Sequence, residues 1–463
     1  MNNGSRPKFL FKNLGPIKEA ELELGDLTII AGRNNTGKTY VAYALYGFLK
    51  RWPFPIIADA RSLTVPPFSQ LVLEAGKAGM LKLPTDQKAL ELRRTEILKW
   101  ITQHYSEYTL PEVFNADAEA FKNASFDVLL RDPPDIDPER FRDSWLSLNQ
   151  EGDEWILSPK VAHPQGSSYF IDLAHSYLHI MFPELLFAVP KPFILTSERF
   201  SISIFHRELD FARSELVEKL LQMRSDDNEK ESGARSDLIK KAASRYARPI
   251  RDNLNFTRDI PDWADRKSGL YEQKRHDDIK RMMQGYYRVE NGGVRFVSTA
   301  RGDRRFNIPL YRASSSARGL SDMYFYMRHV AEPGQLLMVD EPEAHLDTAN
   351  QIEMARLLAR LARAGMKVFI TTHSDYIVKE INNLIMLGRD FRDKERVAKK
   401  YGYDEGECLD ANQVRGYIAE KNGLKLCDMN DYGIDYPNFD ETINNVNRRA
   451  RAFAEHVWAE RKK

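Results

Sequence analysis

Residues 27–39 read Leu27-Thr28-Ile29-Ile30-Ala31 and then Gly32-Arg33-Asn34-Asn35-Thr36-Gly37-Lys38-Thr39. The first five residues form a short apolar run, which is typical of a buried strand. Beyond Thr39, apolar residues recur at helical spacing over 41–49. The stretch therefore predicts a strand, a glycine-containing loop and a helix. The alternating segments of residues 9–31, with turn residues at 15–16 and 25–26, predict a hairpin that leads into the strand.

The loop itself satisfies the pattern G-x-x-x-x-G-K-[ST] in the strand–loop–helix context that gives the pattern meaning. The glycines allow backbone N–H groups to wrap a phosphate, Lys38 is placed to reach the β- and γ-phosphates, and the Thr39 hydroxyl is placed to coordinate Mg²⁺. We therefore predict an ATP and Mg²⁺ site. Its candidate ATP-binding residues are Gly32, Arg33, Asn34, Asn35, Thr36, Gly37, Lys38 and Thr39.

A second sheet unit is predicted near the far end of the chain. Apolar runs at 336–339 and 368–371 flank a helical pattern at 349–364, which indicates a parallel βαβ crossover. Asp340 and Glu341 directly follow the first run. A carboxylate at a strand end can hold the Mg²⁺ shell, and in-line attack on a γ-phosphate needs a base beside the water. We assign Asp340, with Thr39, to the metal and Glu341 to the base.

The next strand is followed by Thr371-Thr372-His373-Ser374. Because parallel strands end at one edge of the sheet, His373 is expected to contact the γ-phosphate. A further strand is predicted at 193–196, and Ser197-Glu198-Arg199 comes at its end. For this trio the sequence leaves open a purely structural supporting role.

These blocks, in this order and with a long insert after the first, resemble the ABC-type ATPases of the SMC, RecF and OLD (overcoming lysogenisation defect) group. The resemblance implies an α/β P-loop fold with an ABC-type nucleotide-binding domain, a mixed sheet flanked by helices, and a large, mainly helical insertion. It makes Asp347 a D-loop residue that communicates across a dimer. The segment Ser197-Glu198-Arg199 is similar to a feature of OLD-like and Septu-type ATPases.

The signature motif of that group departs from its usual form. Where ABC proteins carry a Ser-Gly-Gly core, this chain reads Ala313-Ser314-Ser315-Ser316. The resemblance implies that Ser315, with Ser314, contacts the γ-phosphate held by the other copy. The alternative is that these serines only cap a helix. No glutamine fits the Q-loop well, and Gln70 is a poor candidate.

The resemblance and the patterns together suggest a division of the chain. We expect a split ATPase core (1–60, 190–206 and 284–395), a helical insert (61–189), a charged helical arm (207–283) and a small C-terminal helical region (396–463). Residues 235–305 contain 18 Lys/Arg against 10 Asp/Glu. This local excess fits either a solvated arm or a nucleic-acid surface.

The composition of the chain argues against several classes of protein. The 463 residues carry a formal net charge of +1, and the two cysteines are too few for a disulfide framework or a four-cysteine zinc site. Both cysteines lie after His373, which excludes a zinc-hook ATPase. Long uncharged apolar stretches are absent from the sequence, so we expect a cytoplasmic protein without membrane contact.

The resemblance extends to the ATPase subunits of two-gene phage-defence systems, Septu and PARIS. It implies a homodimer or higher homo-oligomer that controls a separate effector, a TOPRIM or HNH nuclease, in antiviral defence. The alternative is a RecF- or SMC-like repair ATPase that binds duplex DNA through 235–305. No nuclease domain is recognised in the chain itself, and a transporter ATPase is disfavoured by the signature and the large insert.

Overall fold

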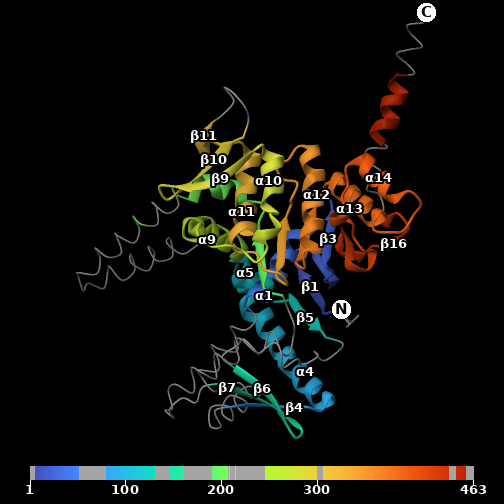
Figure 1. Ribbon diagram of the computed structural model, residues 1–463. Helices are drawn as coiled ribbons and strands as arrows, with labels where there is room; N and C mark the ends of the chain where they lie inside the picture. Colours follow the sequence, from blue (N-terminus) through green and yellow to red (C-terminus); the bar gives the residue numbers. More distant parts are fainter. Residues whose placement is uncertain are drawn as a thin grey trace, which may run out of the picture.

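The computed structural model describes residues 6–51, 80–130, 146–160, 190–206, 246–299, 306–436 and 445–454, together with the isolated positions 208 and 214. Its centre is a nine-stranded mixed sheet that helices flank on both faces (Figure 1). In spatial order the strands are β5 (Ser125–Leu129), β1 (Lys8–Leu14), β2 (Ile17–Glu23), β15 (Asn422–Leu426), β14 (Val414–Glu420), β3 (Leu27–Gly32), β13 (Lys367–Thr372), β12 (Leu336–Asp340) and β8 (Pro192–Leu195).

The second half of this sheet is parallel. Strands β14, β3, β13, β12 and β8 each pair in parallel with the next. Strands β3, β12 and most of β13 are buried on both faces, as expected for a parallel sheet covered by helices. Because all five strands run the same way, the residues that follow β3, β12, β13 and β8 gather at one edge.

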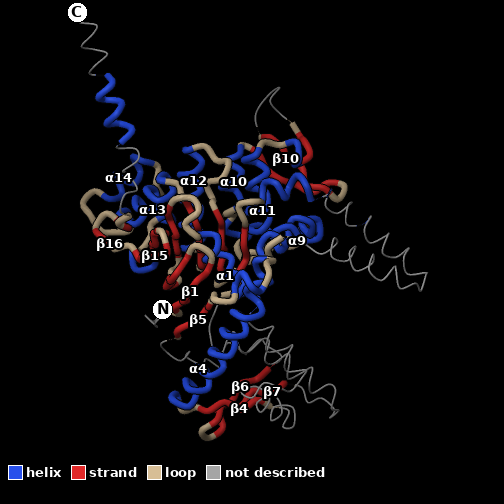
Figure 2. Tube along the Cα trace, turned by 180° about the vertical axis from the view of Figure 1, so that it is seen from behind, coloured by secondary structure: helices blue, strands red, loops and turns tan. Residues whose placement is uncertain are grey.

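Alternate strand residues enter two hydrophobic cores. Ile30 and Met338 contribute to the core that contains α1 (Lys38–Arg51), α4 (Gln87–His104) and α5 (Leu110–Phe114). Ile29 and Val339 contribute to the other core. That core contains α9 (Arg248–Trp263), α10 (His276–Met283), α11 (Ser315–His329), α12 (Thr348–Arg363) and α13 (Asp375–Leu387). Seen from behind, the strands lie between these layers (Figure 2).

Smaller elements surround the central sheet. Three antiparallel strands, β4 (Leu81–Pro84), β7 (Glu154–Pro159) and β6 (Leu146–Glu151), lie at the far end of α4 (Figure 1). The strands β11 (Asn307–Pro309), β10 (Gly293–Ser298) and β9 (Gly285–Glu290) form a second small sheet, and β16 (Met429–Asn430) pairs with β17 (Gly433–Ile434). The remaining helices of the described residues are η1 (Tyr105–Thr109), η2 (Ala118–Phe121), η6 (Tyr271–Gln273), η8 (Leu310–Arg312), α14 (Lys394–Tyr401), η9 (Glu405–Glu407) and η10 (Ala411–Gln413), and residues 199–206 and 445–454 are also helical.

The predicted hairpin and the strands at 27–31, 193–196, 336–339 and 368–371 are confirmed, with small shifts at their ends. Two regional expectations need correction. The described part of the insert 61–189 contains four strands as well as helices, because 125–129 alternates buried and exposed residues and 146–159 folds back at Gly152. The segment 396–463 is not only helical, because 414–420 pairs with β3 in the middle of the sheet.

Within the described residues, no helix is long and apolar enough to cross a membrane.

Candidate nucleotide-binding site

The loop between β3 and α1 depends on its two glycines. Gly32 has φ 153°, and a Cβ there would lie 2.7 Å from the carbonyl oxygen of Ala419 in β14. Gly37 has φ 94°, and a Cβ there would lie 2.7 Å from the Cδ1 of Ile17 in the β1–β2 hairpin. Both close approaches and the positive φ angle of Gly37 exclude larger residues without local rearrangement. The neighbouring strands therefore hold the loop in shape at the start of a 14-residue helix, where backbone N–H groups favour anions.

Lys38 begins α1 and is buried, with 6% of its surface exposed. Its ammonium donates hydrogen bonds to the carbonyl oxygens of Gly32 and Arg33, each at 2.8 Å. Burial lowers the pKa of Lys38, whereas the carboxylates of Glu341, Asp340 and Glu343 oppose that shift. The lysine side chain thus folds back onto the loop 32–37 that precedes it. Phosphate oxygens could replace the two carbonyl oxygens as acceptors of its hydrogen bonds.

Thr39 and Asp340 meet at the edge of the sheet. The Thr39 hydroxyl lies 3.3 Å and 3.4 Å from the two carboxylate oxygens of Asp340, which is 2% exposed. The Thr371 hydroxyl also donates to this carboxylate. The pKa of Asp340 is raised to about 6, mainly by burial and also by the nearby carboxylates of Glu341 and Glu198, against the opposing effect of the Thr371 hydrogen bond.

This donor set fits Mg²⁺. A hydroxyl and one carboxylate are hard oxygen ligands, and Mg²⁺ in nucleotide sites is commonly held by one or two protein oxygens together with substrate phosphates and water. The described residues contain no cluster of three or more His, Cys, Asp or Glu side chains suited to binding a metal without such help. The raised pKa of Asp340 is expected for a carboxylate that is buried beside other acidic groups.

Glu341 follows β12 with an unusual backbone conformation. Its φ of 51° lies in the left-handed region, which non-glycine residues rarely occupy. Its N–H donates to the carbonyl oxygen of Thr371 at 3.1 Å. The pKa of Glu341 is lowered, first by its interaction with His373 and further by the positive charges of Lys38 and Arg199. The side chain is therefore an ionised carboxylate at neutral pH.

His373 lies between two carboxylates at the end of β13. Its Nδ1 is 3.7 Å from Oε1 of Glu341 and 3.2 Å from Oε1 of Glu343. The interaction with Glu341 is the largest cause that raises the pKa of His373. Glu343 is 4% exposed and also accepts hydrogen bonds from the Thr372 hydroxyl and the His373 backbone N–H, at 2.8 and 2.7 Å. Glu343 thus fixes the turn that carries His373.

The serines of the expected signature motif have separate roles in the described structure. Ser314 caps α11, since its side chain accepts a hydrogen bond from the Ala317 N–H at 3.2 Å. Ser316 donates to the carbonyl oxygen of His345 at 2.6 Å. Ser315 is half-buried at the first position of α11. The capping alternative is thus confirmed for Ser314. Because Ser314 caps the helix, the Ser315 hydroxyl is not needed for this task.

Asp347 is exposed and caps α12. It accepts hydrogen bonds from the N–H groups of Ala349 and Asn350 at 3.0 and 3.1 Å, and these bonds lower its pKa, the one from Asn350 most. A contact across a dimer therefore remains a prediction for this residue.

Several residues at this edge were not among the predicted site residues. Glu198 accepts a hydrogen bond from the Tyr43 hydroxyl at 3.3 Å. Arg199 donates to the main-chain carbonyl oxygens of Asp340 and Glu341. Thr371 and Glu343 support the two acidic residues and His373 as described above. The usable signal in the sequence was polarity shortly after a buried strand, which Glu198, Arg199 and Glu343 share. Thr371 lies within β13 and Tyr43 within α1, so neither carries this signal.

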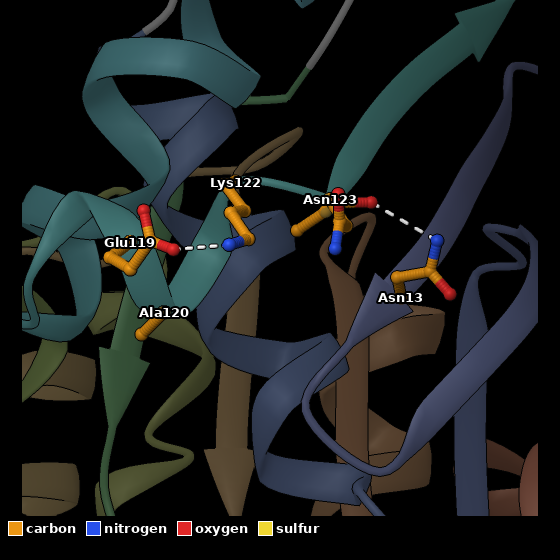
Figure 3. Close-up of a pocket in the computed structure, with 6 residues that line it drawn as sticks. Asn13, Glu119, Ala120, Lys122 and Asn123 are labelled. Carbon is orange, nitrogen blue, oxygen red and sulfur yellow. Dashed lines mark hydrogen bonds and ion pairs between the residues drawn. The ribbon is translucent and has the colours of Figure 1, made fainter.

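Two hollows in the described surface lie apart from the predicted residues. One, of about 450 Å³, is lined by Asn13 and by residues 119, 120 and 122–124, and contains the Lys122–Glu119 ion pair and a hydrogen bond from Asn13 to the Asn123 carbonyl (Figure 3). The other, of about 410 Å³, lies among α9, the β9–β10 hairpin and residues 203–206. Neither is lined by a residue of the loop 32–39 or by Asp340, Glu341 or His373.

Comparisons with known proteins find likeness to ATPase and ATP-binding domains. The AAA ATPase domain family matches residues 212–378, a range that includes Asp340, Glu341 and His373. An ABC transporter ATP-binding protein/permease of Saccharomyces cerevisiae is 29% identical over 109 residues, covering 23% of this chain and 8% of the yeast protein. An uncharacterized ABC transporter ATP-binding protein of Mycobacterium tuberculosis is 24% identical over 119 residues, covering 25% of this chain and 36% of the relative. The chain thus spans a minor part of each relative.

Among solved structures, the SMC head domain from Thermotoga maritima aligns with 91% of this chain and 98% of its own, at 11% identity and a TM-score of 0.31. An Smc head domain bound to the C-terminal domain of ScpA, from Pyrococcus furiosus, aligns at 13% identity and the same TM-score, covering 96% of this chain and 100% of its own. At such scores the likeness carries no argument about function. The predicted α/β P-loop ATPase fold is confirmed by the family match together with the strand order and loop described above.

Proposed function

We propose that the chain binds ATP with Mg²⁺ and hydrolyses it at the edge formed by β3, β12 and β13, and the match to the AAA ATPase domain family supports this proposal. One observation carries the proposal. Thr39, Asp340, Glu341 and His373 come from three separate segments and are brought to one edge, next to the Lys38 ammonium. Phosphate, metal, base and proton-carrying groups are the parts that phosphoryl transfer to water requires.

Each side chain has a step that its geometry suits. Lys38 exchanges its hydrogen bonds to the Gly32 and Arg33 carbonyls for charge-assisted hydrogen bonds to the β- and γ-phosphates, which are stronger. Thr39 and Asp340 would hold Mg²⁺, whose chemistry is to neutralise charge on the phosphates. Glu341, ionised by its surroundings, accepts a hydrogen bond from the attacking water and draws its proton. His373 donates to the γ-phosphate.

We also propose that two copies pair so that each site is completed in trans. The support is local: Ser315 opens a 15-residue helix, and its N–H groups and hydroxyl suit a phosphate held by another copy. The helix α11 packs in a different core from α1 and is anchored near the β12–α12 turn by the Ser316 bond to His345. Asp347, exposed in the same turn, is placed to take part in that contact.

The role of the hydrolysis is proposed from the resemblance alone. It is that of a scaffold or sensor in antiviral defence, which uses ATP-driven pairing to hold and release a separate effector, a TOPRIM or HNH nuclease. A DNA-repair role through residues 235–305 gains little support from the described part of that region. Five of its arginines and lysines are engaged in internal ion pairs, namely Arg248, Lys280, Arg281, Arg288 and Arg295.

The ATPase proposal is tested by measuring phosphate release from the purified chain with ATP and Mg²⁺, beside the Lys38→Ala and Lys50→Ala variants. Both lysines lie on α1, and burial lowers the pKa of both, but only Lys38 adjoins the loop. Lys38→Ala should abolish turnover, because it removes the side-chain cation at the β/γ-phosphates, while Lys50→Ala should leave it intact. Equal turnover in the wild type and Lys38→Ala would refute the assignment of the site.

A further inference from the structure

Arg199 is a buried arginine that makes all of its described hydrogen bonds to main-chain carbonyl groups. It is 3% exposed. Its Nε donates to the Gly319 carbonyl in α11 at 3.1 Å, and its Nη1 donates to the Thr196 carbonyl after β8 at 2.9 Å. The same Nη1 donates to the Asp340 carbonyl at 2.8 Å, and Nη2 donates to the Glu341 carbonyl at 2.8 Å. One guanidinium group therefore joins α11, the end of β8 and the end of β12.

This arrangement uses the shape of arginine more than its charge. The planar fork presents donors on three nitrogens in fixed directions, so it bridges carbonyl groups from three separate elements, whereas the donors of a lysine ammonium all lie on one nitrogen. Burial lowers the pKa of Arg199, while the carboxylates of Asp340, Glu343, Asp322 and Glu341 oppose that shift. The nearby acids thus compensate the charge, and the direct bonds are left to position the backbone.

The backbone of Glu341 is held on both sides. Its N–H is bound to the carbonyl oxygen of Thr371 and its C=O to Arg199. Between these bonds the residue adopts a left-handed φ of 51°, a conformation that persists in a non-glycine residue only when the surroundings determine it. Because the direction of a side chain follows from the backbone, the two bonds also aim the Glu341 carboxylate.

The Gly319 bond extends this support to α11 and, through it, to α9. Thr196 donates from its N–H and its hydroxyl to the side-chain oxygen of Asn253 at 3.0 and 3.2 Å. Asn253 in turn donates to the carboxylate of Asp322, on α11, at 2.8 Å. Arg199 therefore lies inside a polar network that fixes α9 and α11 relative to the strand end that carries Glu341, and a displacement of α11 changes the donor geometry at Arg199.

We propose that Arg199 is the positioning residue for Glu341, and that through Gly319 it makes the aim of this carboxylate depend on the placement of α11. The inference rests on the proposed ATPase function, since it assigns a support to the base of that reaction. It also gives α11, whose first residue is Ser315, a direct connection to hydrolysis within the same chain. An α11 held in place by a bound partner keeps Glu341 aimed, and a displaced α11 does not.

The test compares Arg199→Lys with Arg360→Lys. Arg360 is a matched control because it is a buried arginine too, 4% exposed, but pairs with Asp278 and Glu407 away from the site. Arg199→Lys should lower kcat by about tenfold to a hundredfold, the size of a small misplacement of a reacting group, with KM for ATP changed much less. Arg360→Lys should lower the melting temperature and leave kcat close to that of the wild type.

A double substitution separates positioning from general damage. In single-turnover experiments with radiolabelled ATP, adding Arg199→Lys to Glu341→Gln should cause no further loss, because the carboxylate that Arg199 aims is already absent. An equal fold-loss in both backgrounds overturns the proposal. If the wild type itself shows no Lys38-dependent hydrolysis, the proposed function fails, and a crystal structure of Arg199→Lys then decides the inference. A displaced Glu341 backbone supports the inference, and an unchanged left-handed φ at 341 with the same approach to His373 overturns it.

Discussion

The hydroxyl of Thr39 lies 3.3 Å from the carboxylate of Asp340, although the two residues are 301 positions apart in the chain. They meet because β3 and β12 both pair in parallel with β13 and end at the same edge. A strand-end acid and the first turn of the helix after a phosphate-binding loop thus converge as a result of strand order alone. The chemistry of the site follows from this convergence.

Replacing Thr39 with valine keeps the shape of the side chain and removes its oxygen. We expect the Mg²⁺ concentration needed for half-maximal ATP hydrolysis to rise, and the rate to fall, by about tenfold to a hundredfold, as is typical when a group at a metal site is lost. Phosphate release measured across a Mg²⁺ titration tests this. ATP binding without Mg²⁺ serves as the control and should not change, and an unaltered Mg²⁺ dependence would remove Thr39 from the metal site.

Asp340 should make the ligand-free protein less stable at neutral pH. Burial raises the pKa of Asp340 from an ordinary 3.8 to about 6, so ionising this group costs more in the folded state than in the unfolded state. The cost is complete above the folded pKa, falls as the pH drops from 6 towards 3.8, and vanishes below that range. Asp340→Asn, measured with EDTA at pH 8, should therefore be more stable by about 1–3 kcal/mol.

Thermal unfolding of both proteins between about pH 5 and pH 8 provides the check. The advantage of Asp340→Asn should shrink as the pH falls through the folded pKa, because the wild-type carboxyl then takes up its proton. A stability difference between the two proteins that does not vary over this pH range would show that folding does not raise the pKa of Asp340.

The sequence predicted the parts of the fold whose signal is local. Apolar runs, together with the residues directly after them, mark the strand at 27–31 with its loop and the strands at 336–339 and 368–371. In the structure these three strands lie side by side. Strand β14 was missed because its parallel partner β3 lies almost 400 positions earlier in the chain. The hairpin that β14 forms with β15 is local, and it does not reveal pairing with a distant strand.

Arg199 shows a second reason for incomplete prediction. Its partners are the carbonyl groups of Thr196, Gly319, Asp340 and Glu341, and carbonyl groups exist at every position, so no pattern of side chains marks them. Glu343 differs, because its position two residues after Glu341 is visible in the sequence, but its task of holding the His373 turn depends on β13 lying next to β12. Side-chain chemistry was predictable where it follows a strand end, and support through the backbone was not.

Completion of the site in trans is tested by mixing two inactive variants. In a mixed dimer of Lys38→Ala and Ser315→Arg, both lesions fall in one composite site and the other site is intact. If subunits exchange freely and the sites act independently, activity should return to about a quarter of the wild-type value, because about half of the dimers are mixed and each has one working site. The readout is phosphate release after exchange, with exchange itself followed by fluorescence transfer between labelled subunits.

The matched control for this mixture is Lys38→Ala with Glu341→Gln. Both residues belong to the same half of the site, so every composite site in the mixed dimer carries a lesion and no activity should return. Recovery in this control as well would mean that the two variants compensate by another route. Full exchange without recovery in the Ser315 mixture would count against the trans contact of Ser315.

The most direct test of the account is ATP turnover by Glu341→Gln. The substitution keeps the size and hydrogen bonding of the side chain but removes its capacity to take a proton, so ATP should still bind while phosphate release falls by about a hundredfold or more. ATP should then hold the variant as a closed pair, visible by size-exclusion chromatography with light scattering, whereas Glu395→Gln, at an exposed position on α14, should behave as the wild type. Turnover by Glu341→Gln at the wild-type rate would contradict the assignment of Glu341 as the base and with it the mechanism proposed for this site.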